Sequence, residues 1–449
     1  MEFFSRSIEN FLMRWKDGIN RKPLVLRGAR QTGKTTVVNR FALTFPQYIE
    51  VNLDRYEDRK LFGTERPFAS LIEELFFSRG LRRDIETLLF LDEIQQSPRA
   101  IASLRYFFEE TPQYKVIATG SLLEHASDTK ASFPVGRVSF AYLHPVSFSE
   151  YLAAMGEFQT LAAYGEVPVP PYAHEKLLAL FHRYALLGGM PEAVRVYAQT
   201  KDLQLVSGVY EDLLAAFAGD IEKYRLTAAR RDVVSHVFHT MLCQPAERIS
   251  YNGYGASGYG SVQIKEAFMV LEKAMLCSLV HPLTSVSIPL GPNLKKKPRL
   301  HLVDTGMCNH ALGIRQNLIT LQDLTQSRKG SIAEHLVGQE LAALDMDKVQ
   351  GLHFWVREKN QSSAEMDYVI QHGSRLIPLE VKAGKTGTLR SLMQFMEMSP
   401  ETCALRLYAG PFSVEPASTN SGRKFRLINI PYYQTGKVHD YIDRFGSGQ

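Results

Sequence analysis

Cysteine is scarce in this chain of 449 residues. The four cysteines are Cys243, Cys277, Cys308 and Cys403, and no two of them form a C-x-x-C pair. Their spacing matches neither a disulfide framework nor a cysteine zinc site. We therefore expect a reducing, cytoplasmic environment.

Long apolar runs are also missing from the sequence. Because no segment of about 18 apolar residues is present, we expect no membrane-spanning helix and no membrane partner. Residues 1–6 lack the apolar core of a secretory signal. The net charge is only +5, with 45% hydrophobic and 22% charged residues, which is typical of a soluble globular protein. This mild positive charge is compatible with nucleic-acid binding but does not indicate it.

One stretch has the pattern G-x-x-x-x-G-K-[ST] and runs from Gly28 to Thr35. Residues 24–26 before it predict a buried strand, and residues 36–42 after it predict the start of a helix. In that context loop amides and a helix N-terminus bind phosphate. We expect Lys34 to reach the β- and γ-phosphates of ATP, and Thr35 to hold Mg²⁺. The residues expected to bind the nucleotide are Gly28, Ala29, Arg30, Gln31, Thr32, Gly33, Lys34, Thr35, Thr36, Asp92 and Thr119.

A second nucleotide-site signature is the run of four apolar residues at 88–91, followed by Asp92 and Glu93. The run predicts a central parallel strand, and the acids lie at its carboxyl end, where open α/β sheets bind ligands. We expect Asp92 to hold Mg²⁺ through water and Glu93 to polarise the attacking water.

The next predicted strand, residues 114–121, ends in small polar residues. A hydroxyl at this position can respond to the γ-phosphate, and Thr119 is the first candidate, followed by Ser121. A strand-ending turn without such a role is the alternative for each residue.

Four segments resemble the prokaryotic AAA-type ATPases (AAA_14) that carry a C-terminal DUF4143 domain: residues 28–35, 91–95, 119–121 and 144–151. The resemblance continues at residues 188–192, 302–306 and 380–382, so it covers nearly the whole chain. It implies an arginine finger at Arg137, acting in cis or from a neighbouring subunit; such fingers contribute about 10³–10⁵ in rate. A surface arginine or a structural ion pair is the alternative.

The middle of the chain reads as an α-helical lid after an extended connector at residues 167–171. Helices are predicted at residues 177–187, 203–217, 228–242 and 262–279, and a strand is predicted at residues 286–288. The resemblance implies a winged-helix-like module here.

A glycine-rich tract at residues 251–260 contains four glycines and is a poor helix. It is either an adaptable aromatic loop that stacks on bases or a flexible surface loop. The lysines at 295–297 either touch phosphates or lie on a solvated face.

The C-terminal part shows an ordered set of acids. A predicted helix at residues 330–344 carries Glu334, and strands are predicted at residues 353–356, 366–370 and 376–382. The order of helix acid, then Asp367, then Glu-x-Lys resembles the PD-(D/E)xK nuclease core.

Side chains alternate along a strand, so Glu380 and Lys382 share one face, and Asp367 can face the same cavity. Glu334, Asp367 and Glu380 are therefore candidate Mg²⁺ ligands, and Lys382 is a candidate to orient or activate water at a scissile phosphate. Gln394 on the next helix is a candidate to assist. The alternative is a satisfied buried ion pair without catalytic activity.

The sequence thus predicts an α/β fold in three parts. These are a P-loop NTPase domain with a parallel sheet at residues 1–165, a helical and winged-helix-like region at 166–299, and a restriction-endonuclease-like domain at 300–449. We expect Mg²⁺-dependent ATP binding and hydrolysis coupled to a DNA-directed, nucleolytic C-terminal domain. The alternative is an ATP-dependent regulatory switch whose C-terminal domain only binds DNA or protein. A homo-oligomer or a protein partner is compatible with both.

Overall fold

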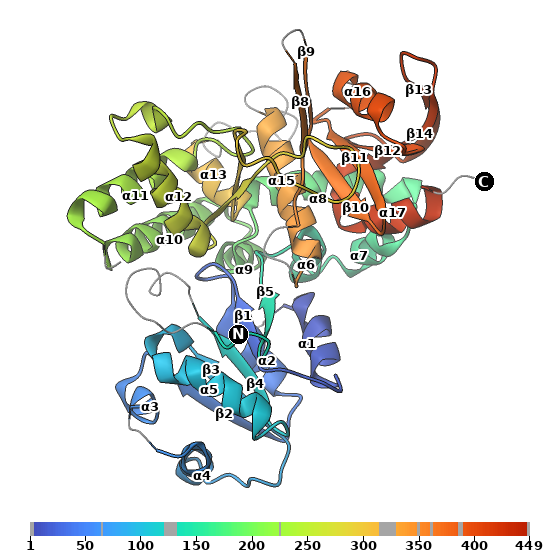
Figure 1. Ribbon diagram of the computed structural model, residues 1–449. Coiled ribbons are helices and arrows are strands. Elements are labelled where there is room, and N and C mark those ends of the chain that lie inside the picture. Colours follow the sequence, from blue (N-terminus) through green and yellow to red (C-terminus); the bar gives the residue numbers. More distant parts are fainter. Residues whose placement is uncertain are drawn as a thin grey trace.

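The computed structural model describes residues 4–63, 66–120, 133–223, 226–313, 329–347, 351–359, 362–384 and 389–446. An N-terminal α/β domain forms the lower part of Figure 1, and the middle and C-terminal regions together form the upper part. Across these ranges, no helix combines the length and the apolar character needed to cross a bilayer.

The N-terminal domain contains a five-stranded sheet with the order β2-β3-β4-β1-β5, and every pairing in it is parallel. This confirms the predicted parallel α/β fold. The strands are β1 (Leu24–Arg27), β2 (Gln47–Asn52), β3 (Thr87–Asp92), β4 (Lys115–Thr119) and β5 (Ser139–Tyr142).

Helices cover both faces of this sheet. Leu89 and Leu91 of β3 pack with α4 and α5, whereas Leu88 and Phe90 pack with α1 and α2. Alternate side chains of one apolar strand are thus buried on opposite faces, which explains the continuous apolar run. The helices are α1 (Ile8–Lys16), α2 (Lys34–Ala42), α3 (Tyr56–Lys60), α4 (Phe68–Ser78) and α5 (Pro98–Glu109), with a 3₁₀ turn η1 (Ile94–Gln96).

The middle region is helical, as predicted, up to residue 273. Two helices precede residue 166, α6 (Phe148–Ala154) and α7 (Phe158–Gly165). They are followed by α8 (His174–Leu187), α9 (Pro191–Thr200), α10 (Leu203–Lys223), α11 (Ala228–Met241) and α12 (Ser261–Lys273), with 3₁₀ turns η3 (Pro171–Ala173) and η4 (Tyr254–Ala256).

Two predicted elements of this region need correction. The helix predicted at 262–279 ends at Lys273, and strand β6 (Cys277–Val280) follows it. Residues 286–288 form a bend rather than a strand, and β6 instead pairs antiparallel with β7 (Arg299–Leu302). The predicted boundary between residues 299 and 300 therefore falls inside β7.

The glycine-rich tract lies against the helices. Tyr254 is buried, and its ring packs edge-on against Phe268 of α12 at a centroid distance of 5.0 Å. Gly255 has a φ of 63°, and a Cβ there would lie 2.6 Å from the His236 ring. The Tyr254 ring is therefore covered by the protein, whereas Tyr251 and Tyr259 of the same tract are only partly buried.

The C-terminal region is built on a mixed sheet with the order β10-β11-β12-β14-β13. β11 and β12 are parallel and are connected through α16, while β10 is antiparallel to β11. The elements are α13 (Thr305–Ala311), α15 (Lys329–Leu344), β8 (Trp355–Lys359), β9 (Ser362–Met366), β10 (Tyr368–His372), β11 (Arg375–Val381), α16 (Arg390–Met398), β12 (Cys403–Tyr408), β13 (Ser413–Ser418), β14 (Lys424–Pro431), η6 (Tyr432–Lys437) and α17 (Val438–Phe445).

Asp304 lies directly before α13, and its side chain accepts from the Met307 N–H at 3.2 Å. One further prediction differs from these elements. The strand predicted at 366–370 is interrupted at Asp367, which lies between β9 and β10.

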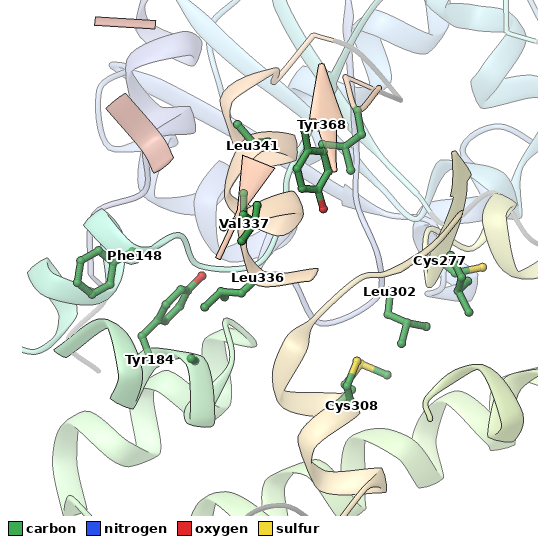
Figure 2. Close-up of a cluster of buried hydrophobic side chains, with 14 of the residues drawn as sticks. Phe148, Tyr184, Cys277, Leu302, Cys308, Leu336, Val337, Leu341 and Tyr368 are labelled. Carbon is green, nitrogen blue, oxygen red and sulfur yellow. The ribbon is translucent and has the colours of Figure 1, made fainter. Parts of the chain in front are cut away.

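Helix α15 lies at the centre of the upper part of the molecule (Figure 1). Figure 2 shows Leu336 and Val337 of α15 beside Tyr184 of α8. Tyr368 of β10 lies nearer to the part of α15 that carries Leu341. One continuous hydrophobic core includes residues from α6 to α17. The middle and C-terminal regions therefore share a core, and α15 belongs to both.

Candidate functional site

The loop from Gly28 to Gly33 has the backbone of a phosphate cradle. Gln31 and Gly33 adopt left-handed φ angles of 64° and 91°. A Cβ at Gly28 would lie 2.5 Å from the Leu143 carbonyl oxygen, so only glycine fits there. The Thr32 hydroxyl donates to the Ala29 carbonyl at 2.8 Å. The loop is thus fixed by its own contacts at the start of α2.

Lys34, the first residue of α2, is buried with its ammonium in this loop. Its Nζ donates to the carbonyls of Gly28 and Ala29, both at 2.9 Å. Burial lowers the pKa of Lys34, while the carboxylates of Glu93 and Asp92 oppose that shift. The cation therefore lies where a phosphate chain wrapped by the loop would meet it.

Asp92, the last residue of β3, contacts the first turn of α2 and the end of β4. Its Oδ2 accepts from the Thr35 hydroxyl at 3.0 Å, and its Oδ1 accepts from the Thr119 hydroxyl. The side chain is 4% exposed. A threonine hydroxyl next to a carboxylate is a hard-oxygen donor set that suits Mg²⁺. The structure thus brings together Thr35, Asp92 and Thr119, three of the residues expected at the nucleotide site.

Glu93 has an unusual backbone for a non-glycine residue, with φ 51° and ψ 50°. Its N–H donates to Asp92 Oδ1 at 3.1 Å, and its side chain accepts from the Gln95 amide. A Cβ at Gly120 would lie 2.2 Å from Gln95 Oε1, so glycine there makes room for Gln95. Strained left-handed residues occur often at active sites, and this one directly follows the end of β3.

Arg137 lies at the opposite edge of the sheet. It lies two residues before Ser139, the first residue of β5. Ser139 pairs with Leu24 at the amino end of β1, whereas the P-loop follows the carboxyl end of β1. Its guanidinium forms an ion pair with Glu109 at 2.6 Å. A strand length therefore separates Arg137 from its own loop in this structure, and the arginine-finger role of Arg137 stays a prediction. Ser121 lies outside the described residues.

One arginine next to the loop was not recognised in the sequence, whereas Arg30, a residue of the loop itself, was among the expected nucleotide-binding residues. Buried Arg6 donates to the Thr32 carbonyl at 3.1 Å and to Glu150 at 2.9 Å, and Arg30 forms an ion pair with Asp220 of α10. Arg6 precedes α1 and has no motif around it. The only signal in the sequence is that Arg6 lies in a segment of apolar residues that face the core.

The C-terminal acids surround a second buried cation, Arg299 of β7. Arg299 is 2% exposed, and it forms ion pairs with Glu334 of α15 and Glu365 of β9. Its Nη1 also donates to the Asp367 carbonyl at 2.6 Å. Neither Arg299 nor Glu365 was expected at the site, because the sequence places Arg299 far from the acids and directly after a basic run.

The two charged residues of the Glu-x-Lys segment are in contact with each other. Lys382 Nζ donates to Glu380 Oε1 at 2.6 Å, and Asp367 Oδ2 accepts from the Val381 N–H at 2.7 Å. Burial is the largest cause that raises the pKa of Glu334, of Asp367 and of Glu380, which reaches about 7. The three carboxyl groups are thus near one another, and burial favours their neutral forms while Arg299 and Lys382 oppose that shift.

The expected metal triad is nevertheless not assembled. Across the described ranges, no group of three or more His, Cys, Asp or Glu side chains is arranged to hold a metal ion. Glu334, an expected ligand, is paired with Arg299 instead. Gln394 lies on α16, and within the described part its Oε1 has no hydrogen-bond partner.

Comparison with known proteins divides the chain into three matched segments. Residues 20–152 match the AAA domain family, residues 178–318 match a domain of unknown function (DUF8612), and residues 329–433 match a domain of unknown function (DUF4143). The middle match extends across the boundary predicted at residue 299. No curated protein matches the chain.

Several solved structures are similar to it. The Walker-type ATPase PABY2304 of Pyrococcus abyssi is 16% identical over 69% of this chain and 96% of its own, with a TM-score of 0.44. PCH-2 of C. elegans is 14% identical over 44% of this chain and 64% of its own, with a TM-score of 0.29. The Aeropyrum pernix ORC1 protein, solved in complex with DNA, is 15% identical over 69% and 92%, with a TM-score of 0.28.

The family matches support an AAA-type P-loop ATPase with a DUF4143 domain. They confirm these two parts of the resemblance found in the sequence. The structural similarities are too distant to add to this conclusion.

Proposed function

We propose that the chain binds MgATP at the loop of residues 28–35 and hydrolyses it. The observation that supports this most directly is the convergence of Thr35 and Thr119 on the Asp92 carboxylate beside the buried Lys34 ammonium. When bound, Mg²⁺ would neutralise phosphate charge and orient the terminal phosphate.

Each residue at this site has a distinct task in the proposal. The loop amides and Lys34 bind the phosphates, and Thr35 with Asp92 would hold Mg²⁺. Glu93 accepts a proton from the attacking water or polarises it. Thr119 reports the state of the γ-phosphate through its bond to Asp92.

For the C-terminal region we propose a nuclease-like fold that acts as a DNA- or protein-binding module. The layout of α15, β10, β11, α16 and β12 supports this fold, because two antiparallel strands are followed by a helix and a parallel strand. Arg299 supports a binding role, because it neutralises Glu334 and Glu365 from within. The two helices α11 and α12 followed by the β6–β7 pair likewise support a winged-helix-like middle region.

Metal-dependent DNA cleavage is the second candidate function. The contact between Lys382 and Glu380, with Asp367 bonded to the intervening residue, favours it. If Mg²⁺ or Mn²⁺ produces cleavage of single- or double-stranded DNA, and Lys382→Ala stops it, this candidate replaces the binding module. Salt-dependent DNA binding without cleavage supports the binding module.

The test of the ATPase proposal is Lys34→Ala, with Lys382→Ala as a matched lysine control. We expect Lys34→Ala to abolish ATP hydrolysis and to leave the fold intact by circular dichroism. Lys382→Ala should hydrolyse ATP as the wild type does. Hydrolysis by Lys34→Ala at the wild-type rate would overturn the proposal.

A further inference from the structure

The N-terminus of α6 is held by two carboxylates from different regions of the chain. The Ser147 N–H donates to Glu150 Oε2 at 3.0 Å, within α6 itself. The Phe148 N–H donates to Glu340 Oε1 of α15, also at 3.0 Å. Both carboxylates are buried. The start of α6 is thus a junction between the N-terminal domain and α15.

On the N-terminal side, Arg6 connects this junction to the P-loop. One guanidinium donates to the Thr32 carbonyl at 3.1 Å, to the His144 carbonyl at 2.7 Å and to Glu150 at 2.9 Å. Arg6 is 6% exposed. A Cβ on Gly33 would lie 3.7 Å from its Nη1, so the guanidinium lies directly against the loop. Moving the loop therefore moves a group that also holds the segment before α6.

On the C-terminal side, Glu340 is tied to α8 and α15. Its Oε1 accepts from the Tyr184 hydroxyl at 2.8 Å, and Gln339 Nε2 donates to that same hydroxyl oxygen at 3.2 Å. Figure 2 shows Tyr184 beside Leu336, which lies four residues before Glu340 on α15. One turn and a half further back, α15 carries Glu334, the partner of Arg299.

We propose that Arg6 is a positioning residue for ATP binding and that Glu340 makes the affinity of the P-loop for ATP depend on α15. The inference rests on the proposed ATP site. The buried hydrogen bonds of Arg6, Glu150 and Glu340 leave these side chains few alternative arrangements. A displacement of the P-loop should therefore also displace the start of α6 and α15. Coupling between sites is reciprocal, so ATP also changes the free energy of the α15 arrangement around Glu334.

The first test measures the equilibrium dissociation constant of ATP and the kcat for purified full-length variants. Arg6→Lys keeps the charge but loses the three-way fork, and we expect the dissociation constant to rise about fivefold or more. Glu340→Leu removes both acceptor contacts and should have an effect of similar size. Glu340→Gln keeps an acceptor oxygen and should restore affinity to within about twofold of wild type.

Surface variants Arg82→Lys and Glu73→Gln are the matched controls, since both side chains lie on the exposed face of the N-terminal domain. If wild type and controls bind ATP, and Arg6→Lys and Glu340→Leu bind it equally well, the inference is wrong although the ATP site stands. If wild type itself binds no ATP, the proposed function fails instead.

A second measurement uses wild-type protein alone, so it does not depend on whether the variants fold. Hydrogen exchange is compared with and without a saturating non-hydrolysable ATP analogue. We expect added protection in the P-loop, at residues 147–150 and along α15. Protection confined to the P-loop would overturn the coupling.

Discussion

The chain contains two buried clusters in which carboxylates meet a cation, and they differ in how the charge is satisfied. At the P-loop, the Lys34 ammonium bonds to two backbone carbonyls, and Asp92 is bonded by two threonine hydroxyls. In the C-terminal cluster, Arg299 forms ion pairs with Glu334 and Glu365 directly.

This difference in partners suits the P-loop cluster to binding charged ligands, whereas the charges of the Arg299 cluster are largely neutralised by one another. Neutral partners leave the charges of Lys34 and Asp92 available to a phosphate and to a divalent cation. Arginine pairs with carboxylates in a fixed fork, which neutralises them within the protein. The two clusters therefore support different tasks, although both contain acids next to a basic residue.

The largest expected effect comes from the P-loop side of the comparison. Glu93→Gln removes the group that polarises water and should lower the kcat for ATP hydrolysis about 10²–10⁴-fold. The dissociation constant of ATP should stay within about twofold, because Glu93 is not expected to bind phosphate. Steady-state kinetics and equilibrium binding together test this. Equal losses in both quantities would place Glu93 in nucleotide binding instead.

The C-terminal cluster should respond mainly in stability. Arg299→Met leaves the buried Glu334 without its cation and Glu365 with Arg248 alone, and it should lower the free energy of unfolding by about 3–5 kcal/mol. The double variant Arg299→Met with Glu334→Leu should recover part of this loss. Urea unfolding monitored by circular dichroism measures both.

Arg248→Met is the matched control, since Arg248 contacts the same Glu365 at 3.4 Å from a more exposed position. Its cost should be below about 1 kcal/mol. If Arg299→Met is as stable as this control, the cluster is not held together by Arg299.

The junction between the two regions should show a pH dependence. Burial raises the pKa of Glu340 to about 7, while bonds from Tyr184 and Phe148 oppose the shift and nearby Glu150 adds to it. The folded protein keeps a proton there between about pH 4.5 and pH 7 that the unfolded chain has lost, so stability falls as pH rises through this window. Glu340→Gln should lack this loss, and its advantage over wild type should grow by about 1–3 kcal/mol from pH 5 to pH 8. Urea unfolding at both pH values measures the difference, and a constant difference would contradict the assignment.

The smallest expected effect concerns Arg137. Since Arg137 lies at the edge of the sheet away from its own P-loop, Arg137→Ala should change ATP hydrolysis by less than about twofold in dilute protein. If a neighbouring subunit uses this arginine, wild-type specific activity rises with protein concentration and that of Arg137→Ala does not. Arg105→Ala, which loses the same Glu109 partner, is the control.

The sequence predicted the helices, strands and loops whose conformation depends on the residues within one short segment. The strand, glycine loop and helix around Lys34 were predictable because each has its own periodicity and because the loop needs glycine at fixed positions. The helix bearing Glu334 and the Glu-x-Lys strand were predictable for the same reason. Where the apolar pattern continued past Lys273, the helix and the following β6 could not be told apart, because both are buried.

Residues that act across long sequence separations were not predictable in this way. Arg299, Glu365 and Arg6 carry no motif, and their partners lie far along the chain. Glu340 lies four residues after Leu336, about one helical turn, and therefore on the apolar face of α15. This spacing was the only signal in the sequence that Glu340 is buried.

The sequence by itself determined the phosphate loop, the parallel sheet that carries it, and the residue types available at both acidic clusters, because these follow from backbone geometry and side-chain periodicity within short segments. Only the tertiary structure decided which charges meet. It placed Arg299 among the C-terminal acids, Arg137 away from its own P-loop, and Glu340 at the start of α6. Electrostatic interactions depend on distance in space, and distance in space between remote segments is set by how the helices and sheets pack.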